Sequence, residues 1–136
     1  MTASSFEKVI AERGRLVYTN VGDSMYPLIK PRDLLIIDAV NRPLRLWDVP
    51  LYKRDNGQYV LHRIVKIKNG SYVMCGDNRC TSEYGITDRH IIGVLTGIVR
   101  DGRTLPVTMP EHKSILFRKI KRYLKKLRKQ EAYHGT

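Results

Sequence analysis

The sequence predicts a mainly β domain with a short N-terminal helix and a basic C-terminal helix. Three Asx-Gly pairs are each flanked by β-branched or aromatic residues, which is the pattern of β-hairpins. The pairs are Asn56-Gly57, Asn69-Gly70 and Asp101-Gly102. From residue 112 onward, apolar residues recur at three- and four-residue steps, the period of an amphipathic helix. The 136 residues suit one domain, expected in residues 1–110 with its core in 16–108, followed by the basic helix in 111–136.

The first part of the chain predicts a helix and two strands around a tight turn. Apolar residues at helical spacing end at Gly14, which indicates a helix from Ser5 to Arg13. Leu16–Asn20 is expected to be a short strand that enters the turn, and the apolar run in Leu34–Asp38 predicts a buried strand that leaves it. The turn at residues 22–27 therefore lies between strands.

The middle of the chain predicts a loop followed by two hairpins. Pro43 and Pro50 bracket a loop around Trp47, and the hairpins follow it. In the first hairpin, Tyr59–Lys68 is expected to form one strand that pairs with Ser71–Met74. In the second, Ile91–Arg100 is expected to pair with Arg103–Thr108.

The positive charge of the chain is concentrated near its C-terminus. The net charge is +12, and residues 111–136 hold nine Lys and Arg residues against two Glu. Their apolar residues form one stripe of the expected helix, namely Leu116, Ile120, Tyr123, Leu124 and Leu127. Such a helix can dock on the domain, or it can bind an anionic membrane surface through residues 113–129. Binding to nucleic acid is disfavoured, because aromatic residues are not interleaved with the basic ones.

The sequence predicts a cytoplasmic protein, with peripheral attachment to a membrane through the basic helix as the alternative. Residues 1–6 lack the basic and apolar regions of a secretory signal, and no apolar run approaches the ~18 residues of a transmembrane helix. Cys75 and Cys80 have no histidine at a recognisable zinc spacing. We therefore expect neither a metal nor another cofactor.

Ser24 is the candidate nucleophile. It lies between a flexible glycine and a bulky methionine, and a proline closes the turn shortly after it. A serine hydroxyl keeps its proton at neutral pH, so a hydrolytic role requires a base within hydrogen-bond distance. Without such a base, Ser24 would be an ordinary solvated turn serine.

His62 is the candidate base. In a continuous strand, alternation places it on the apolar face of Val60 and Ile64, where it could equally be a core histidine. An imidazole pKa of about 6.5 would allow it to accept the proton of Ser24 near pH 7. A carboxylate on the other ring nitrogen would complete a triad. The candidate carboxylates are Asp77, Glu83 and Asp88.

An ordered set of short segments resembles the conserved boxes of type I signal peptidases. The segments are Gly22-Asp23-Ser24-Met25-Tyr26-Pro27, Arg32-Asp33-Leu34-Leu35-Ile36, Asp48-Val49-Pro50-Leu51-Tyr52, His62-Arg63-Ile64-Val65, Gly76-Asp77-Asn78 and Ile92-Gly93. The His-Arg-Ile segment is similar to the archaeal and endoplasmic reticulum subtype, in which His replaces the bacterial Lys. The resemblance spans residues 21–99. It implies a coiled β-sheet peptidase domain, shared with the self-cleaving SOS repressors.

This resemblance also implies roles for individual residues. Ser24 would be the nucleophile and His62 the general base of a serine endopeptidase. Glu83 would be the relay acid and Asp77 a supporting residue. The substrate would be an extended leader or signal-like peptide, cut near small residues and contacted by the turn that contains Ser24. The remaining residues of that turn are Gly22, Asp23, Met25, Tyr26 and Pro27.

Two other functions are compatible with the same boxes. A non-catalytic module that binds peptides or a membrane surface is favoured by Gly22, which stands where signal peptidases usually carry a serine that donates to the oxyanion. Trp47 and Pro50 favour it too, because they interrupt the box that lines the substrate groove. Self-cleavage of the SOS-repressor type is the third function. It is disfavoured because the repressors use Lys as the base and no Ala-Gly or Cys-Gly bond precedes Ser24.

Overall fold

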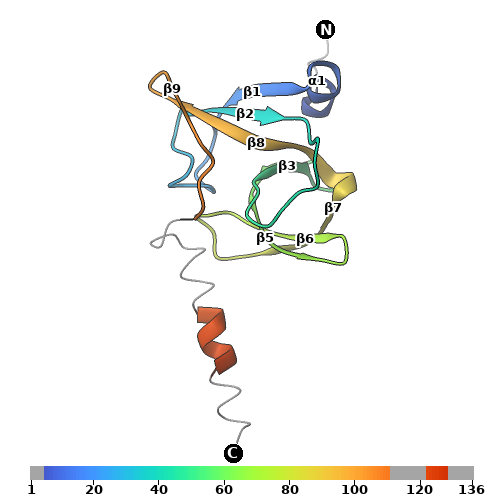
Figure 1. The fold of residues 1–136 in the computed structure, drawn as a ribbon, viewed down its shortest axis with the longest axis vertical. Helices are drawn as coiled ribbons and strands as arrows, with labels where there is room; N and C mark the ends of the chain where they lie inside the picture. Colours follow the sequence, from blue (N-terminus) through green and yellow to red (C-terminus); the bar gives the residue numbers. More distant parts are fainter. Residues whose placement is uncertain (1–4, 111–121, 129–136) are drawn as a thin grey trace, which may run out of the picture.

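The computed structural model describes residues 5–110 and 122–128, and its fold is mainly β, as the sequence predicts (Figure 1). In chain order the elements are α1 (Phe6–Arg13), β1 (Arg15–Thr19), β2 (Leu34–Asp38), β3 (Pro50–Lys53), β4 (Tyr59–Leu61), β5 (Arg63–Lys68), β6 (Ser71–Cys75), β7 (Glu83–Thr87), the 3-10 helix η1 (Asp88–His90), β8 (Ile91–Arg100) and β9 (Arg103–Leu105), with a helical segment at 122–128.

The strands form two antiparallel sheets. The larger sheet has the order β1-β2-β8-β3-β4, with β9 added to β8, and the smaller one has the order β5-β6-β7. Register shifts between Ile36 and Ile37 and between Leu51 and Tyr52 interrupt the pairing with β8. Such bulges increase the twist of a sheet, and here they accompany its curl. Because every neighbouring pair is antiparallel, the two edge strands β1 and β4 run in the same direction.

The N-terminal helix follows its sequence signals closely. The side chain of Ser5 accepts a hydrogen bond from the Lys8 N–H, and Gly14 ends the helix with a φ of 74°. The predicted strands at Leu16–Asn20 and Leu34–Asp38 agree with β1 and β2 to within one residue. The second predicted hairpin is β8 and β9, although β9 ends at Leu105 rather than Thr108.

The prediction of one continuous strand over Tyr59–Lys68 is wrong. The strand is broken at His62: β4 pairs with β3 in the larger sheet, whereas β5 pairs with β6 in the smaller one. The residue after the break, Arg63, is only 1% exposed, and its guanidinium forms a salt bridge with the equally buried Asp77. Because a charged group can be buried only beside its partner, this pair is satisfied where the chain passes from one sheet to the other.

The Asn56-Gly57 turn joins β3 to β4, as its hairpin signal indicates, although the sequence does not indicate the bounds of β3, and β7 was not predicted. Pro50 begins β3, a position at which the missing N–H of proline costs the sheet least. Tyr52, two residues later, is fully buried in the second of two apolar cores. Its position brings the phenol oxygen to the boundary between the two sheets, because it donates to Glu83 at the start of β7.

The segment 122–128 is helical, as expected for part of the basic helix, and the remainder of that predicted helix lies outside the described residues. All seven of its side chains are exposed, including Tyr123, Leu124 and Leu127. The described part of the apolar stripe is therefore not docked on the domain. Within residues 5–110 and 122–128, no helix combines the length and apolar character required to cross a membrane.

Candidate active site

Ser24 is half-buried in a turn that follows β1. The turn is closed by hydrogen bonds from the Tyr26 N–H to the Asp23 carbonyl (3.1 Å) and from the Ile29 N–H to the Met25 carbonyl (3.0 Å). Met25 and Ile29 are 3% and 2% exposed and belong to the first apolar core. The flanking residues therefore anchor the turn in the core, while Ser24 faces a cleft.

A second loop, Gly76–Arg79, holds the Ser24 turn from the other side. The Asn78 N–H donates to the Ser24 carbonyl (2.9 Å), and the Asn78 side chain donates to the Asp23 carbonyl (3.1 Å). The Arg79 guanidinium binds the Asp23 carboxylate at 2.8 Å, which lowers the pKa of Asp23. The turn is thus fixed by a loop that is distant in the sequence.

Gly76 lies next to both the Ser24 backbone and the His62 ring, and the side chains of Ser24 and His62 form no hydrogen bond with each other in the structure. A Cβ atom at this position would lie 2.6 Å from the Ser24 carbonyl oxygen and 3.2 Å from Cδ2 of His62. The Ser24 backbone and the imidazole ring therefore approach the same point, from the two sides of a residue that has no side chain. The His62 edge that lies beside Gly76 carries Cδ2, a carbon bonded to Nε2.

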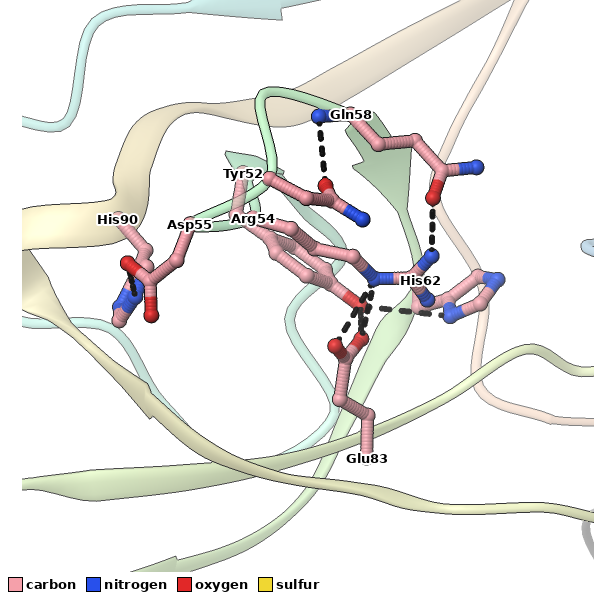
Figure 2. A network of polar contacts seen from close by, with 8 residues as sticks. Tyr52, Arg54, Asp55, Gln58, His62, Glu83 and His90 are labelled. Carbon is pink, nitrogen blue, oxygen red and sulfur yellow. Dashed lines mark hydrogen bonds and ion pairs between the residues drawn. The ribbon is translucent and has the colours of Figure 1, made fainter.

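The other edge of the His62 ring faces Tyr52. The Tyr52 hydroxyl lies 3.4 Å from His62 Nδ1 and donates its single proton to Glu83 Oε1 at 2.7 Å (Figure 2). Its oxygen can then act only as an acceptor toward His62, so Nδ1 must carry the ring proton. In a neutral imidazole this leaves Nε2 unprotonated. Figure 2 shows that this second nitrogen points away from Tyr52.

Glu83 therefore reaches His62 only through Tyr52. Both oxygens of its carboxylate also accept from Nε of Arg54, at 3.1 and 2.8 Å (Figure 2). Burial acts to raise the pKa of Glu83, but the hydrogen bonds from Arg54 and Tyr52 outweigh it and lower the pKa. The carboxylate is thus ionised and fixed in position. The direct contact expected between Glu83 and His62 is replaced by an indirect one through the Tyr52 hydroxyl.

Burial lowers the pKa of His62 to about 4, and the positive charge of Arg54 contributes to the decrease, while the negative charge of Glu83 opposes it. This corrects the expectation of an ordinary imidazole pKa near 6.5. The positive charge of Arg79 lowers this pKa as well. At neutral pH His62 is uncharged and is a weaker base than a solvated histidine.

Asp77 does not hold His62. Its carboxylate accepts two hydrogen bonds from the Arg63 guanidinium, both at 2.8 Å, and both side chains are almost completely buried. The Arg63 guanidinium also donates to the Trp47 carbonyl at 3.0 Å. Asp77 is thus bound to Arg63, the residue that follows His62, and the supporting role that the resemblance implies stays a prediction. The third carboxylate considered, Asp88, instead accepts from the Tyr72 hydroxyl at 2.5 Å.

The candidate site opens into a cleft of about 550 Å³ between the two edge strands of the curled sheet. Of the turn residues expected to contact substrate, Gly22, Asp23 and Met25 line this cleft. Tyr26 and Pro27 do not line it. The residues from β4 and its vicinity that line the opposite wall are Gln58, Tyr59, Val60, Leu61 and His62.

Two groups of Ser24 are available for chemistry. Within residues 5–110 and 122–128, neither its hydroxyl nor its backbone N–H has a hydrogen-bond partner. The hydroxyl can therefore attack a bound carbonyl, and the N–H can stabilise the oxyanion that results. Gly22 supplies no side-chain donor, so the backbone N–H remains the obvious one, as the sequence indicates.

Sequence reasoning missed two members of the site, Tyr52 and Arg54. Tyr52 belongs to one of the boxes that resemble signal peptidases, but its role depends on a contact with Glu83, 31 residues later. In the part of the chain that the structure describes, no cluster of His, Cys, Asp and Glu side chains could hold a metal ion. Comparison with known proteins gave no match, either to a family model or to a curated protein.

Proposed function

We propose that this chain is a serine peptidase of the signal peptidase type, with Ser24 as the nucleophile and His62 as the general base. The observation that carries the proposal is the orientation of His62. Tyr52 accepts from Nδ1, and the Cδ2 edge of the ring lies beside Gly76, which the Ser24 backbone carbonyl also approaches. The ring therefore has an unprotonated Nε2 in the cleft that Ser24 also lines, and the Ser24 hydroxyl has no hydrogen-bond partner among the described residues.

The substrate in this proposal is an extended leader or signal-like peptide that is cut near small residues. Edge strands carry unpaired N–H and C=O groups, to which an extended peptide can add as a further strand. The cleft has such an edge on each side, β1 and β4. Its floor includes the apolar side chains of Met25, Ile29 and Leu51, which suit apolar peptide side chains.

The chemistry follows from the atoms in the cleft. Ser24 Oγ attacks the carbonyl carbon of the scissile bond while its proton passes to His62 Nε2, and the Ser24 N–H stabilises the oxyanion. The tetrahedral intermediate collapses to an ester of Ser24, and the amine leaves with the proton from His62. A water molecule, deprotonated by the same nitrogen, then hydrolyses the ester. The imidazolium formed in each step is stabilised by the Tyr52 oxygen and the Glu83 carboxylate behind it.

The proposal is tested by covalent labelling with a fluorophosphonate probe, followed by mass spectrometry of the labelled peptide. We expect modification of Ser24 in the wild type and its loss in Ser24→Ala and His62→Ala. Ser71→Ala, a half-buried serine of β6 outside the cleft, is the matched control and should leave labelling unchanged. Binding of peptides in the cleft without any labelling of Ser24 would overturn catalysis in favour of the non-catalytic binding module.

A membrane surface is the partner that we propose for the basic helix. In the described segment, Tyr123, Leu124 and Leu127 are exposed together with four basic side chains. Apolar residues within a basic helix bind the boundary of an anionic bilayer. Leu124→Glu should reduce binding to vesicles of phosphatidylcholine mixed with phosphatidylserine, whereas Ile67→Glu, an exposed apolar residue of β5, should not. Equal binding by the two variants would contradict this assignment.

A further inference from the structure

Two cysteines bracket the loop that holds the Ser24 turn. Cys75 is the last residue of β6, and Cys80 follows the loop Gly76–Arg79. Within this loop the Asn78 N–H donates to the Ser24 carbonyl at 2.9 Å. Both cysteines are thiols in the structure. They are the two cysteines of the whole chain, so a disulfide within it can only join this pair.

The Cys75 sulfur lies close to the backbone of Cys80. Its S–H donates to the Arg79 carbonyl oxygen at 3.5 Å, and that oxygen belongs to the peptide unit that joins Arg79 to Cys80. The oxygen of a trans peptide unit lies about 3 Å from the next Cα, so Cys75 Sγ is within about 6 Å of the Cys80 Cα. Rotation of the Cys80 side chain and a small shift of the exposed end of the loop suffice to bring the two sulfurs into bonding distance.

The two thiols differ in their access to solvent. Cys80 is exposed, whereas Cys75 is 0% exposed. An exposed cysteine that is oxidised first, with a second cysteine beside it to resolve the sulfenic acid, is the arrangement of a redox-sensing pair. In a reducing compartment, which the sequence predicts for this chain, such a disulfide forms only transiently under oxidative conditions.

We propose that Cys80 is a site of oxidation by peroxides, and that Cys75 then closes a disulfide with it that switches off the Ser24 site. In the first step the Cys80 thiolate attacks the peroxide, the O–O bond breaks, hydroxide leaves and the sulfur becomes a sulfenic acid. Cys75 Sγ then attacks this sulfur as its own proton leaves, and the S–O bond breaks with release of water. In total, two thiols and one hydrogen peroxide give one disulfide and two water molecules.

The disulfide displaces the loop that holds the Ser24 turn. Bond formation removes the Cys75 proton that the Arg79 carbonyl accepts and draws Cys80 toward the same place. The peptide unit of Arg79 must then turn, although its guanidinium holds the Asp23 carboxylate at 2.8 Å. Displacement of a reacting group by about 1 Å can cost about 100-fold in rate. This effect on Ser24 rests on the proposed peptidase function, whereas the disulfide itself does not.

The test treats the full chain with hydrogen peroxide, removes the excess with catalase, and follows the disulfide and the fluorophosphonate labelling of Ser24 in parallel. After alkylation of the remaining thiols, trypsin cuts behind Arg79, so peptides 69–79 and 80–89 stay linked only where the disulfide has formed. We expect linked peptides and a labelling rate lowered at least about tenfold, both reversed by dithiothreitol. Cys80→Ser changes an exposed residue, and it should give no linked peptides and keep its labelling rate in peroxide.

The outcomes separate this inference from the function of the site. Loss of labelling without linked peptides, or an equal loss in Cys80→Ser, would overturn the switch, because oxidation elsewhere in the cleft, as at Met25, would then explain the change. Linked peptides with unaltered labelling would support the disulfide and contradict its control of Ser24. If the reduced protein showed no labelling of Ser24 at all, the peptidase would be overturned, while the linked peptides would still decide whether the disulfide forms.

Discussion

Acidification should destabilise the protein through His62. The folded-state pKa of His62 is about 4, against about 6.5 for an unfolded histidine. As the pH falls through this interval, the unfolded chain binds the proton first, so the free energy of unfolding decreases. The contribution of His62 to stability is complete above pH ~6.5 and is lost as the pH falls toward 4. His62→Gln keeps a neutral polar side chain and removes this titration.

The magnitude follows from the difference between the two pKa values. At pH 4 the wild type should have lost about 3 kcal/mol through this residue relative to neutral pH. Every other titrating group is common to wild type and His62→Gln. The difference in unfolding free energy between the two proteins should therefore change by about 3 kcal/mol in favour of the variant between pH 7 and pH 4.

Urea denaturation of both proteins at half-unit pH steps measures this difference. An NMR titration of the imidazole in the folded wild type gives the pKa directly, and its ¹⁵N shifts report whether the proton is on Nδ1. A ring that titrates near pH 6.5, or two proteins that lose stability in parallel, would refute the reasoning. The result would then mean that the ring is solvated and that neither its burial nor Arg54 controls its charge.

Three further substitutions probe the support of the site. Tyr52→Phe removes the acceptor for Nδ1 and should lower the rate of Ser24 labelling about 10- to 100-fold, with loss of the single His62 tautomer in the ¹⁵N spectrum. Gly76→Ala should lower labelling about 100-fold or more, because its methyl group overlaps the Ser24 carbonyl, while thermal melting shows that the fold persists. Arg63→Met leaves a buried carboxylate without its partner and should cost about 3–5 kcal/mol in urea denaturation.

Each of these predictions has a control. Tyr84→Phe changes an exposed tyrosine and should leave labelling unaltered. A Cβ atom at Gly70 would have no atom within 4 Å, so any loss of labelling or stability in Gly70→Ala reflects the positive φ of this residue and not a steric overlap. Arg15→Met breaks an exposed ion pair and should cost at most about 1 kcal/mol. If Tyr52→Phe, Gly76→Ala or Arg63→Met behaved like its control, the substituted residue would have no special role in supporting the site.

Local signals in the sequence account for most of the secondary structure. The Ser5 cap and Gly14 define α1 because both act within one helical turn. The Asx-Gly pairs define the hairpins because the turn residues themselves adopt positive φ, as at Asn69 and Gly70. Such features need no knowledge of the rest of the fold, so a single sequence suffices to predict them.

The break at His62 could not be predicted in this way. Periodicity favours one strand through residues 59–68, whereas the break lies next to the buried pair of Arg63 with Asp77, which is 14 residues away. The contact between Tyr52 and Glu83 joins residues that are even farther apart in the sequence. The sequence therefore indicates candidate residues for the proposed chemistry, whereas the tautomer and the lowered pKa of His62 arise from contacts that only the tertiary structure brings together.

The position of His62 between two strands makes the orientation of its ring depend on how the two sheets pack together. It is the single residue between β4 of the larger sheet and β5 of the smaller one, and the contact of Tyr52 with Glu83 crosses the same boundary. Any rotation of one sheet against the other would turn the imidazole and would also stretch the hydrogen bond between Tyr52 and Glu83. In the proposed mechanism, a chain whose two sheets have not yet packed together would thus have no oriented His62. Its Ser24 hydroxyl would stay unreactive until folding is complete.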